Sequence, residues 1–378
     1  MTGMKIGIDA RMYGPAVGGG GIGRYVQELV TFLPACDGFP PCVAFVKPEN
    51  ADALPGGYEK RVVDVHWYTL REQIALPRVI DRERLDLVHI PHWNVPLALR
   101  TPFVVTIHDL ILLDEPRSAR ATTRHPLVFA LKQAGFRRVL RHALFASRRV
   151  IAVSEATKRS ILRHFPALPP EKIDVIYEGV TALPSPDESA AAPKPYLLSV
   201  GNAYPHKNLE ALLRAFRLAR EAHPGVRLVL AGRDDVFARR LSASPEARAL
   251  GDAFIFVPNP TDAQLAALYQ KAAGYVYPSR LEGFGLPPLE AMSQGAPVAA
   301  ARAGSLPEVL GDAARFFDPR DERDMARALE DLVGDAGLRR ALVERGFARV
   351  RRYSWRRMAE ETLASYRRAL ERSNPCDL

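Results

Sequence analysis

Short apolar or β-branched runs alternate with longer stretches of helical periodicity along the first half of the chain. The runs are Lys5–Ala10, Val43–Val46, Arg61–Trp67, Leu87–Ile90, Phe103–His108, Val150–Val153 and Ile173–Ile176. Amphipathic segments such as Arg24–Leu33 and Leu127–Phe145 lie between many of them. Because strands that alternate with helices build parallel sheets, this pattern predicts a doubly wound α/β domain over residues 1–182.

A second domain of the same class is predicted after a proline-rich stretch. Residues 183–195, LPSPDESAAAPKP, have the composition of an interdomain linker. The strand pattern restarts at Tyr196–Val200, Arg227–Ala231, Phe254–Val257, Gly274–Tyr277, Val298–Ala301 and Arg315–Phe317, which gives a domain over 196–352. Ligands of such sheets bind beyond the carboxyl ends of the strands, so we expect the functional residues in the loops after these runs.

The composition fits two folded domains. The chain has 378 residues, and 47% of them are hydrophobic, which is enough for two cores. No stretch approaches the roughly 20 apolar residues of a membrane-spanning helix, and the N-terminal segment lacks a signal-peptide pattern, so we expect a cytoplasmic protein. Cys36, Cys42 and Cys376 are odd in number and show no zinc spacing, so we expect reduced thiols.

The net charge of +9 leaves three classes of partner open: nucleic acid, an anionic membrane surface and a phosphorylated substrate. Composition alone does not choose among them. Motifs with their own chemistry are therefore needed to select the partner.

The most informative motif runs from Tyr275 to Val298, YVYPSRLEGFGLPPLEAMSQGAPV. It predicts a strand that ends near Ser279, a glycine-containing loop, and a helix that begins at Pro287 or Pro288 and is stopped by Gly295 and Pro297. Such a loop exposes backbone N–H groups at the positive end of a helix, which is a site for a phosphate or a sugar oxygen. Glu282 and Glu290 bracket this site; each alone could also be a solvated loop carboxylate or a first-turn helix residue.

This motif resembles the paired-glutamate signature of retaining glycosyltransferases of family 4. The resemblance implies the GT-B fold, in which two Rossmann-like domains face each other across a cleft and the C-terminal domain holds the nucleotide-sugar donor. It implies that Glu282 contacts donor-sugar hydroxyls and that Glu290 binds the ribose. The loop that holds the sugar and diphosphate would consist of Gly283, Phe284, Gly285 and Leu286.

A second match to the family is SVGNAYPHKNLEALLRAF at Ser199–Phe216. Lys207 directly precedes a helix whose expected N-cap is Asn208, where a cation is unfavourable unless an anion shares the site. A donor phosphate would supply that anion. Many family members carry an arginine where this chain has Asn202, so a second phosphate contact would have to come from Arg280 or Arg233.

In the first domain, VVTIHDLILLDEP places His108 and Asp109 at the end of a predicted strand. The HDL sequence resembles the family segment whose histidine faces the donor sugar, so the resemblance assigns that role to His108. His89 and His92 show no established metal spacing with it, and the family resemblance implies catalysis without a metal or another cofactor.

The glycine run Gly18–Gly23 formally contains GxGxxG and precedes a predicted helix, RYVQELVTFL. It fits a dinucleotide site poorly, because about eight residues separate it from the preceding strand. It resembles the family loop that approaches the donor phosphates, which makes Gly20 and Gly21 candidate donor contacts; a turn without a ligand remains an equal alternative.

Three further segments resemble the family and support the fold: VSEATKRSIL at Val153–Leu162, VIYEGV at Val175–Val180, and the C-terminal YSWRRMAEETLASYRRAL. The last of them predicts a helix within 353–372 that crosses back onto the N-terminal domain.

The leading function is transfer of a hexose, with mannose from a guanosine donor as the leading guess, to a saccharide or lipid-linked acceptor in cell-surface polysaccharide synthesis. Alternatives are an NAD-dependent nucleotide-sugar epimerase or dehydrogenase, for which a YxxxK pair is missing, and a basic nucleic-acid or surface-binding scaffold. The arginines form no aromatic-interleaved patch, which speaks against nucleic acid. One face of the helix predicted around Leu127–Phe145 is basic and suggests peripheral contact with the anionic inner membrane surface, although packing of the other face on the sheet explains that pattern equally well. The basic residues are Arg138, Arg141, His142, Arg148 and Arg149.

Overall fold

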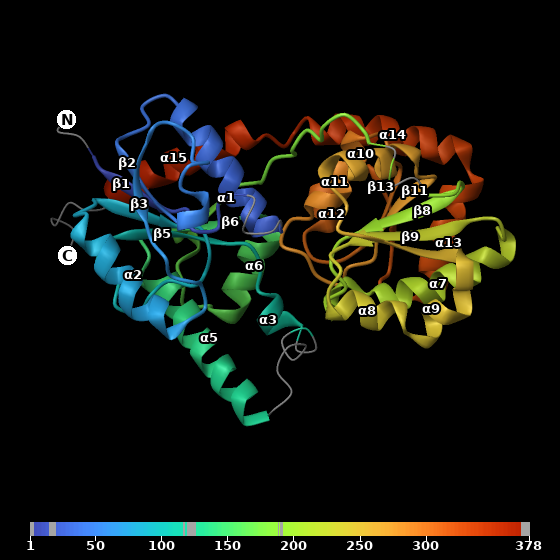
Figure 1. Cartoon of the computed structure of the whole chain (residues 1–378), viewed down its shortest axis with the longest axis horizontal. Helices are drawn as coiled ribbons and strands as arrows, with labels where there is room; N and C mark the ends of the chain where they lie inside the picture. The colour runs from blue at the N-terminus through green and yellow to red at the C-terminus, as the bar shows by residue number, and fades with distance from the viewer. Residues whose placement is uncertain are drawn as a thin grey trace. The chain divides into compact units, whose positions relative to one another are not determined.

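The computed structural model describes residues 4–14, 20–115, 118, 126–187, 189 and 192–371. The chain folds into two compact units (Figure 1). Unit 1 consists of Met1–Leu110, Thr123–Gly179 and Ser354–Leu378, and unit 2 consists of Ile111–Thr122 and Val180–Tyr353.

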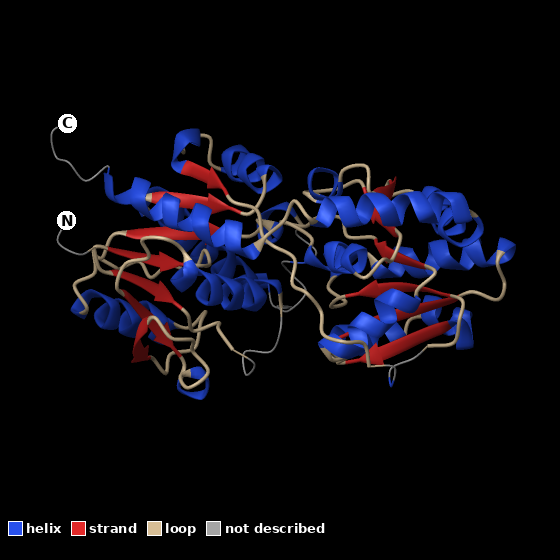
Figure 2. Cartoon of the chain, turned by 90° about the horizontal axis from the view of Figure 1, so that it is seen from above, coloured by secondary structure: helices blue, strands red, loops and turns tan. Residues whose placement is uncertain are grey.

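In the described part of unit 1, seven parallel strands form one sheet in the order β3-β2-β1-β4-β5-β6-β7. They are β1 (Ile6–Asp9), β2 (Cys42–Val46), β3 (Tyr58–Val62), β4 (Leu87–Ile90), β5 (Phe103–Ile107), β6 (Arg149–Ala152) and β7 (Ile173–Val175). The strands β1, β2, β4, β5 and β6 are buried along their whole length, because helices cover both faces of the sheet (Figure 2). This burial explains why they stand out as apolar runs.

The strand predicted at Arg61–Trp67 is wrong in position. The strand β3 lies at Tyr58–Val62, and residues 63–69 form a loop. The reason is that β3 is an edge strand with exposed positions, so its sequence YEKRV carries charges instead of an apolar run. Val63 and Val65 are buried between exposed neighbours and imitate the alternation of a strand.

The helices of unit 1 include those predicted at Arg24–Leu33, at Leu127–Phe145 and within 353–372. They are α1 (Gly21–Phe32), α2 (Leu70–Arg82), α5 (Pro126–Ala146), α6 (Glu155–His164) and α15 (Trp355–Glu371). Helix α1 begins three residues before the predicted Arg24, so Gly21 and Gly23 lie in its first turn.

The C-terminal helix α15 packs against α1, which confirms that the end of the chain returns to the N-terminal domain. Its Tyr366 hydroxyl lies 2.7 Å from Nδ1 of His89, and its Ser365 hydroxyl donates to Asp174 at 2.6 Å. Tyr353, at the start of the predicted segment, is part of unit 2, and residue 372 lies outside the described residues.

Within the described residues of unit 2, six parallel strands form a sheet in the order β10-β9-β8-β11-β12-β13. They are β8 (Tyr196–Val200), β9 (Arg227–Gly232), β10 (Phe254–Pro258), β11 (Gly274–Tyr277), β12 (Val298–Ala301) and β13 (Ala314–Phe317). The helices are α3 (Ile111–Asp114), α7 (Leu209–Ala222), α8 (Val236–Ser242), α9 (Pro245–Leu250), α10 (Asp262–Lys271), α11 (Leu286–Ser293), α12 (Leu306–Leu310), α13 (Glu322–Gly334) and α14 (Ala336–Val350). All six strands agree with the predicted runs to within one residue at each end.

Both sheets have a topological switch point, where the chain order reverses. In unit 1 the switch lies between the neighbouring strands β1 and β4, and in unit 2 it lies between β8 and β11. The loops after two such strands diverge and leave space at the carboxyl edge of the sheet, which is where parallel α/β sheets bind ligands. The two switch points are therefore the first places in which to look for function.

The described ranges contain no helix that is long and apolar enough to span a membrane. Cys36 and Cys42 are buried free thiols, and Cys376 lies outside the described residues.

Gly179 packs closely against the start of α15, where the chain returns to unit 1. A Cβ added at Gly179 would lie 2.3 Å from the backbone nitrogen of Trp355, the first residue of α15. Because a backbone atom cannot give way without a shift of the helix, we expect Gly179→Ala to destabilise unit 1 by about 1–3 kcal/mol, measured as a lower unfolding midpoint.

The matched control is Gly135→Ala in the middle of α5, where no atom lies within 4 Å of the added Cβ. This variant should gain roughly 0.5–1 kcal/mol from helix propensity. Equal midpoints for the two variants would contradict the packing of α15 at Gly179.

Candidate active site

The switch point of unit 2 gathers the strongest candidates from the sequence. Strand β8 leads into Gly201, Asn202 and the turn Pro205–Lys207, and its neighbour β11 leads into Ser279 and Glu282. A small pocket between these two loops is lined by Gly201, Asn202, Lys207, Tyr277 and Ser279, among others. Residues about 75 positions apart in the chain are thereby brought to one edge of the sheet.

An ion pair joins the two loops. The Lys207 ammonium donates to Oε1 of Glu282 at 2.7 Å and to the hydroxyl of Tyr277 at 2.9 Å, and it lies 5.1 Å from the centre of the Tyr277 ring. The side chains of Lys207 and Glu282 are only 14% and 11% exposed, so solvent screens their attraction weakly.

The pair also affects the protonation of its members. Burial raises the pKa of Glu282, but the charge of Lys207, the nearby His206 and hydrogen bonds to the carboxylate together outweigh burial and lower that pKa below its usual value. Burial and the Glu282 charge raise the pKa of Tyr277, which therefore stays a neutral phenol. Near neutral pH the site contains a carboxylate, an ammonium group and a neutral hydroxyl in direct contact.

The loop that carries Lys207 is fixed from two sides. The backbone N–H of Arg280 donates to the His206 carbonyl at 2.8 Å, and the backbone N–H of His206 donates to the Ser118 hydroxyl at 2.9 Å. Burial lowers the pKa of His206 to about 4, so its ring is neutral. Asn208 occupies the N-cap position of α7, but its side chain does not cap the helix and donates instead to the Pro319 carbonyl.

The glycine-containing loop reaches the helix α11 as expected, with one correction. Gly285 is the N-cap at φ 102°, a conformation that favours glycine, and α11 begins at Leu286, one residue before the predicted start. Glu290 is then the fifth residue of the helix, so it lies beyond the first turn; its carboxylate accepts from the Tyr269 hydroxyl at 3.3 Å. The helix ends as predicted, with Gly295 at φ 77° in a Schellman arrangement.

Ser305 holds the loop from behind. Its hydroxyl contacts the carbonyls of Glu282 and Phe284 at 3.1 and 2.9 Å. A Cβ at the preceding Gly304 would lie 2.8 Å from the backbone of Glu282, so only glycine permits this approach. These contacts fix the backbone of the loop that leads into α11.

Oδ1 of Asn202 and Nε of Arg280 are among the buried polar atoms beside this site that lack a hydrogen-bond partner in the described part of the chain. A buried polar atom without a partner costs free energy in a folded protein. One of the two is an acceptor and the other a donor, so a ligand with both hydroxyl and anionic oxygen atoms could satisfy both. Arg233, the other suggested cation, is exposed.

His108 lies in unit 1, at the carboxyl end of β5, as the sequence predicted. Its Nε2 donates to the Pro91 carbonyl at 3.0 Å, and its Nδ1 faces Oε1 of Glu178 at 3.2 Å. The ring is buried and packs edge-on against Tyr25. Both ring nitrogens are thus engaged within unit 1, and Asp109 follows in a half-buried position.

Of the other histidines at this edge, His89 makes structural contacts. His89 bonds with Tyr366 and Thr106, and burial lowers its pKa to about 3. Burial also lowers the pKa of His92 well below its usual value. Among the described residues, no group of three or more His, Cys, Asp or Glu side chains is placed to hold a metal ion.

The glycine-rich run is described only in part, because Gly18 and Gly19 lie outside the described residues. Gly20 is the N-cap of α1 in an extended conformation, and Gly21 is the first helical residue. An added Cβ would meet no atom within 4 Å at either position, so packing does not require glycine there.

No sequence motif pointed to several residues at the carboxyl edges of the two sheets. The sequence pattern places Tyr277 in a predicted strand and Glu178 in a segment that supports the fold. The buried ion pairs of Arg11 with Asp9 and Glu72 carried no local motif. Their position could have indicated a functional role, because Tyr277 ends β11 and Arg11 follows β1, and both strands flank a switch point.

Comparison with known proteins places the chain in a family. The model for glycosyl transferases group 1 matches residues 185–349, and the model for glycosyltransferase family 4 matches residues 19–182. The O-antigen chain mannosyltransferase B of Escherichia coli is 30% identical over 382 residues, which cover 92% of this chain and 96% of that protein. This chain belongs to glycosyltransferase family 4.

A second relative is much longer than this chain. The serotype-specific mannosyltransferase WbdA of Escherichia coli is 30% identical over 77% of this chain, but the chain spans only 36% of that protein's length. The match with WbdA therefore extends to about a third of the relative.

Solved structures show the fold. Sucrose-phosphate synthase from Thermosynechococcus elongatus superposes with a TM-score of 0.76 at 22% identity, covering 98% of this chain and all of the other. HepE of Anabaena, solved in complex with UDP and glucose, gives a TM-score of 0.71 at 18% identity, covering 96% of this chain and 99% of the other. The predicted GT-B fold, with two Rossmann-like domains, is confirmed by these matches and by the two parallel sheets.

The ion pair of unit 2 yields a stability prediction. Lys207→Met leaves the Glu282 carboxylate buried without its cation, so we expect a loss of about 3 kcal/mol at pH 7. The double variant Lys207→Met/Glu282→Gln should recover part of this loss, because it removes the unpaired charge. Urea unfolding of the wild type, both single variants and the double variant measures the coupling.

The pH dependence has a definite sign. In wild type the pKa of Glu282 is lowered by folding, so the stability from the pair is present above the unfolded pKa, about 4.3, and is lost as pH falls through the lowered value. In Lys207→Met, burial raises the pKa of Glu282, so the buried carboxylate becomes neutral on acidification. The free energy of unfolding of Lys207→Met should therefore approach that of the double variant as the pH falls. A difference independent of pH would contradict the assigned ion pair.

Proposed function

We propose that this chain is a retaining glycosyltransferase that moves a hexose from a nucleotide-diphosphate sugar to an acceptor. The observation that carries the proposal is the contact of Lys207, Glu282 and Tyr277 at the switch point of unit 2, directly before the amino end of α11. Membership of family 4 supports the reaction class, and the UDP and glucose bound by HepE support a nucleotide-sugar donor.

The proposed donor site uses each charge for one part of the ligand. The diphosphate would lie at the N–H groups of residues 283–286, where the helix end is positive, with Lys207 as its counter-charge. The free Nε–H of Arg280 would donate to a phosphate oxygen, and Oδ1 of Asn202 would accept from a donor hydroxyl. Glu282 would bind sugar hydroxyls, and Glu290 the ribose.

Catalysis would rest on stabilisation of the leaving group. Negative charge gathers on the diphosphate as the glycosidic bond breaks, and Lys207 and the loop amides are fixed in place before the reaction, so they stabilise the transition state without reorganisation. Retention would follow if a donor phosphate oxygen took the acceptor proton on the face that the diphosphate leaves. This chemistry requires no metal.

His108 would act from unit 1 on the donor sugar. Its ring is oriented by Glu178 and Pro91, so one of these contacts must be exchanged for a sugar hydroxyl in the complex. We propose mannose as the sugar, guanosine diphosphate as the leaving group and a polysaccharide-assembly acceptor. The mannose and the acceptor are supported by relatives at 30% identity, which include an O-antigen chain mannosyltransferase and a serotype-specific mannosyltransferase.

Three substitutions test the assignment. Lys207→Ala should weaken binding of nucleoside diphosphate and lower the transfer rate by about 10²–10³, because it removes a charge that stabilises the leaving group. Glu282→Gln should leave nucleotide binding nearly intact and impair use of the sugar. His108→Ala should spare binding of free nucleotide. The measurements are thermal shifts with UDP, GDP and ADP, followed by transfer and donor-hydrolysis assays.

Thermal unfolding of the three variants separates loss of function from loss of fold. Near-normal transfer by all three variants would contradict the active-site assignment. The same assays in excess EDTA test metal independence: activity abolished by chelation and restored by magnesium or manganese would contradict the proposed donor site.

A membrane contact is proposed on a different surface. The first turns of α5 extend away from the sheet of unit 1 (Figure 1) and expose Leu127, Val128 and Leu131, with exposed fractions of 76%, 45% and 76%. Exposed arginines, including Arg138 and Arg141, follow on the same helix. Arg149, which the sequence grouped with them, is instead buried in β6 and paired with Asp174.

Apolar side chains that insert beside cations are the pattern of peripheral binding to anionic lipid. We expect Leu127→Ser/Leu131→Ser to reduce cosedimentation with vesicles rich in anionic lipid, while Phe347→Ser, an exposed apolar position of unit 2, leaves it unchanged. Absence of wild-type binding even at low salt would rule out this contact.

A further inference from the structure

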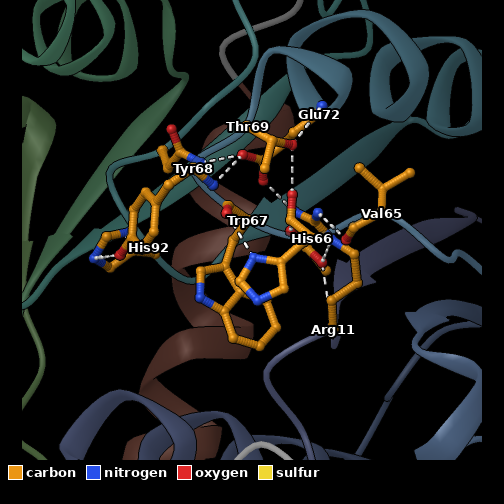
Figure 3. A network of polar contacts seen from close by, with 10 residues as sticks. Arg11, Val65, His66, Trp67, Tyr68, Thr69, Glu72 and His92 are labelled. Atoms are coloured by element: carbon orange, nitrogen blue, oxygen red, sulfur yellow. Dashed lines mark hydrogen bonds and ion pairs between the residues drawn. The ribbon is translucent and has the colours of Figure 1, made fainter. Parts of the chain in front are cut away.

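The switch point of unit 1 carries a cluster that the donor site does not use. Arg11 follows β1, and His92, Trp93 and Asn94 follow its neighbour β4. The loop 63–69 after β3 joins them at the same edge (Figure 3). This is the part of unit 1 where the topology of the sheet favours a ligand.

Glu72, on α2, ties the three loops together. Its Oε1 accepts from Arg11 at 2.7 Å, and its Oε2 accepts from the backbone N–H of Tyr68 at 2.8 Å and from the side-chain amide of Asn94. Arg11 also donates to the Val65 carbonyl at 3.1 Å and to Asp9. Arg11 is 3% exposed and Glu72 1%, so this ion pair lies inside the protein.

Such a buried network contributes little net stability, because desolvation of the charges offsets their attraction. What it does supply is geometry. It holds Tyr68 at φ 62°, a left-handed conformation that costs a residue with a side chain about 1–2 kcal/mol. Strained residues of this kind cluster at ligand sites, where the surroundings force an uncommon conformation.

The held residue is an exposed aromatic ring. Tyr68 is 51% exposed, and one face of its ring stacks on Trp93 at 5.4 Å between centroids, with 29° between the planes. Trp93 is in turn braced edge-on by Phe136 at 4.7 Å. The outer face of Tyr68 is thus a rigid apolar platform on the surface.

Polar groups border the platform. The Tyr68 hydroxyl lies 3.2 Å from a ring nitrogen of His92, whose lowered pKa keeps it neutral and able to both donate and accept. Burial and the charge of Glu72 raise the pKa of Tyr68, and the nearby charge of Asp109 raises it further. The His92 ring lies 6.4 Å from the His108 ring, so the platform is continuous with the residue proposed to face the donor sugar.

We propose that Tyr68 and Trp93 form the binding platform for the acceptor sugar. An apolar ring face with directional polar groups at its rim matches a hexopyranose, which has C–H groups on its faces and hydroxyls at its edge. Arg11 and Glu72 are positioning residues for this platform. The assignment rests on the proposed transfer function and names the side of unit 1 on which the acceptor binds.

The experiment compares Tyr68→Ala, Tyr68→Phe and the control Leu70→Ala, which truncates an 85% exposed neighbour. The probes are methyl and octyl α-D-mannopyranoside, with GDP-mannose as donor. We expect Tyr68→Ala to raise the KM for the octyl mannoside by about tenfold, and Tyr68→Phe, which keeps the ring, to stay within about threefold of wild type. Leu70→Ala should match wild type.

Two further readouts separate the platform from the donor site. GDP release without acceptor reports on the donor site alone and should differ by less than about twofold between Tyr68→Ala and wild type. Titration of tryptophan fluorescence with methyl mannoside should show saturation in wild type and weaker binding in Tyr68→Ala.

An unchanged KM in Tyr68→Ala, or no saturable mannoside binding by a wild type that hydrolyses its donor, would overturn the platform. Failure of wild type to hydrolyse any nucleotide sugar would instead contradict the proposed function, and the fluorescence titration would still test the platform. Circular dichroism verifies the fold of each variant.

Discussion

The geometry of a doubly wound parallel sheet is the constraint on which the rest of this structure depends. Each sheet grows outward in both directions from its first strand, so β1 meets β4 and β8 meets β11 as neighbours whose following loops part in opposite directions. All parallel strands present their carboxyl ends at one edge, so the side chains that follow these four strands gather at two places. Lys207 and Glu282 meet at one place, and Arg11 and Asn94 at the other.

The two places use their charges in different ways. In unit 2 the pair of Lys207 and Glu282 is partly accessible and lies beside unpartnered polar atoms, so a ligand can exchange for the protein contacts. In unit 1 the pair of Arg11 and Glu72 is buried and every observed contact of Glu72 serves to orient a loop. The first arrangement suits binding of an anion, and the second suits the positioning of neighbouring groups.

The sequence predicted most of the fold because buried parallel strands are continuous apolar runs. The prediction was less accurate at exposed elements. The edge strand β3 was missed because its sequence YEKRV is charged, while Val63 and Val65 have the alternation of a strand. The start of α1 was missed because Gly21 and Gly23 disfavour a helix locally, and packing of the later residues overrides that preference. Local propensity alone cannot weigh such tertiary effects.

The same distinction applies to the sites. Lys207 and Glu282 were chosen separately by motif, yet their direct contact and the hydroxyl of Tyr277 between the loops depend on packing across the sheet. The loop 63–69 carried no sequence motif. Its position depends on three contacts of Glu72, with Tyr68, Asn94 and Arg11, which lie 4, 22 and 61 positions from Glu72 in the sequence. A buried carboxylate with that set of partners would be less costly as an apolar side chain if stability alone mattered. Its presence under a strained, exposed tyrosine is therefore best explained by the need to hold that ring in one place.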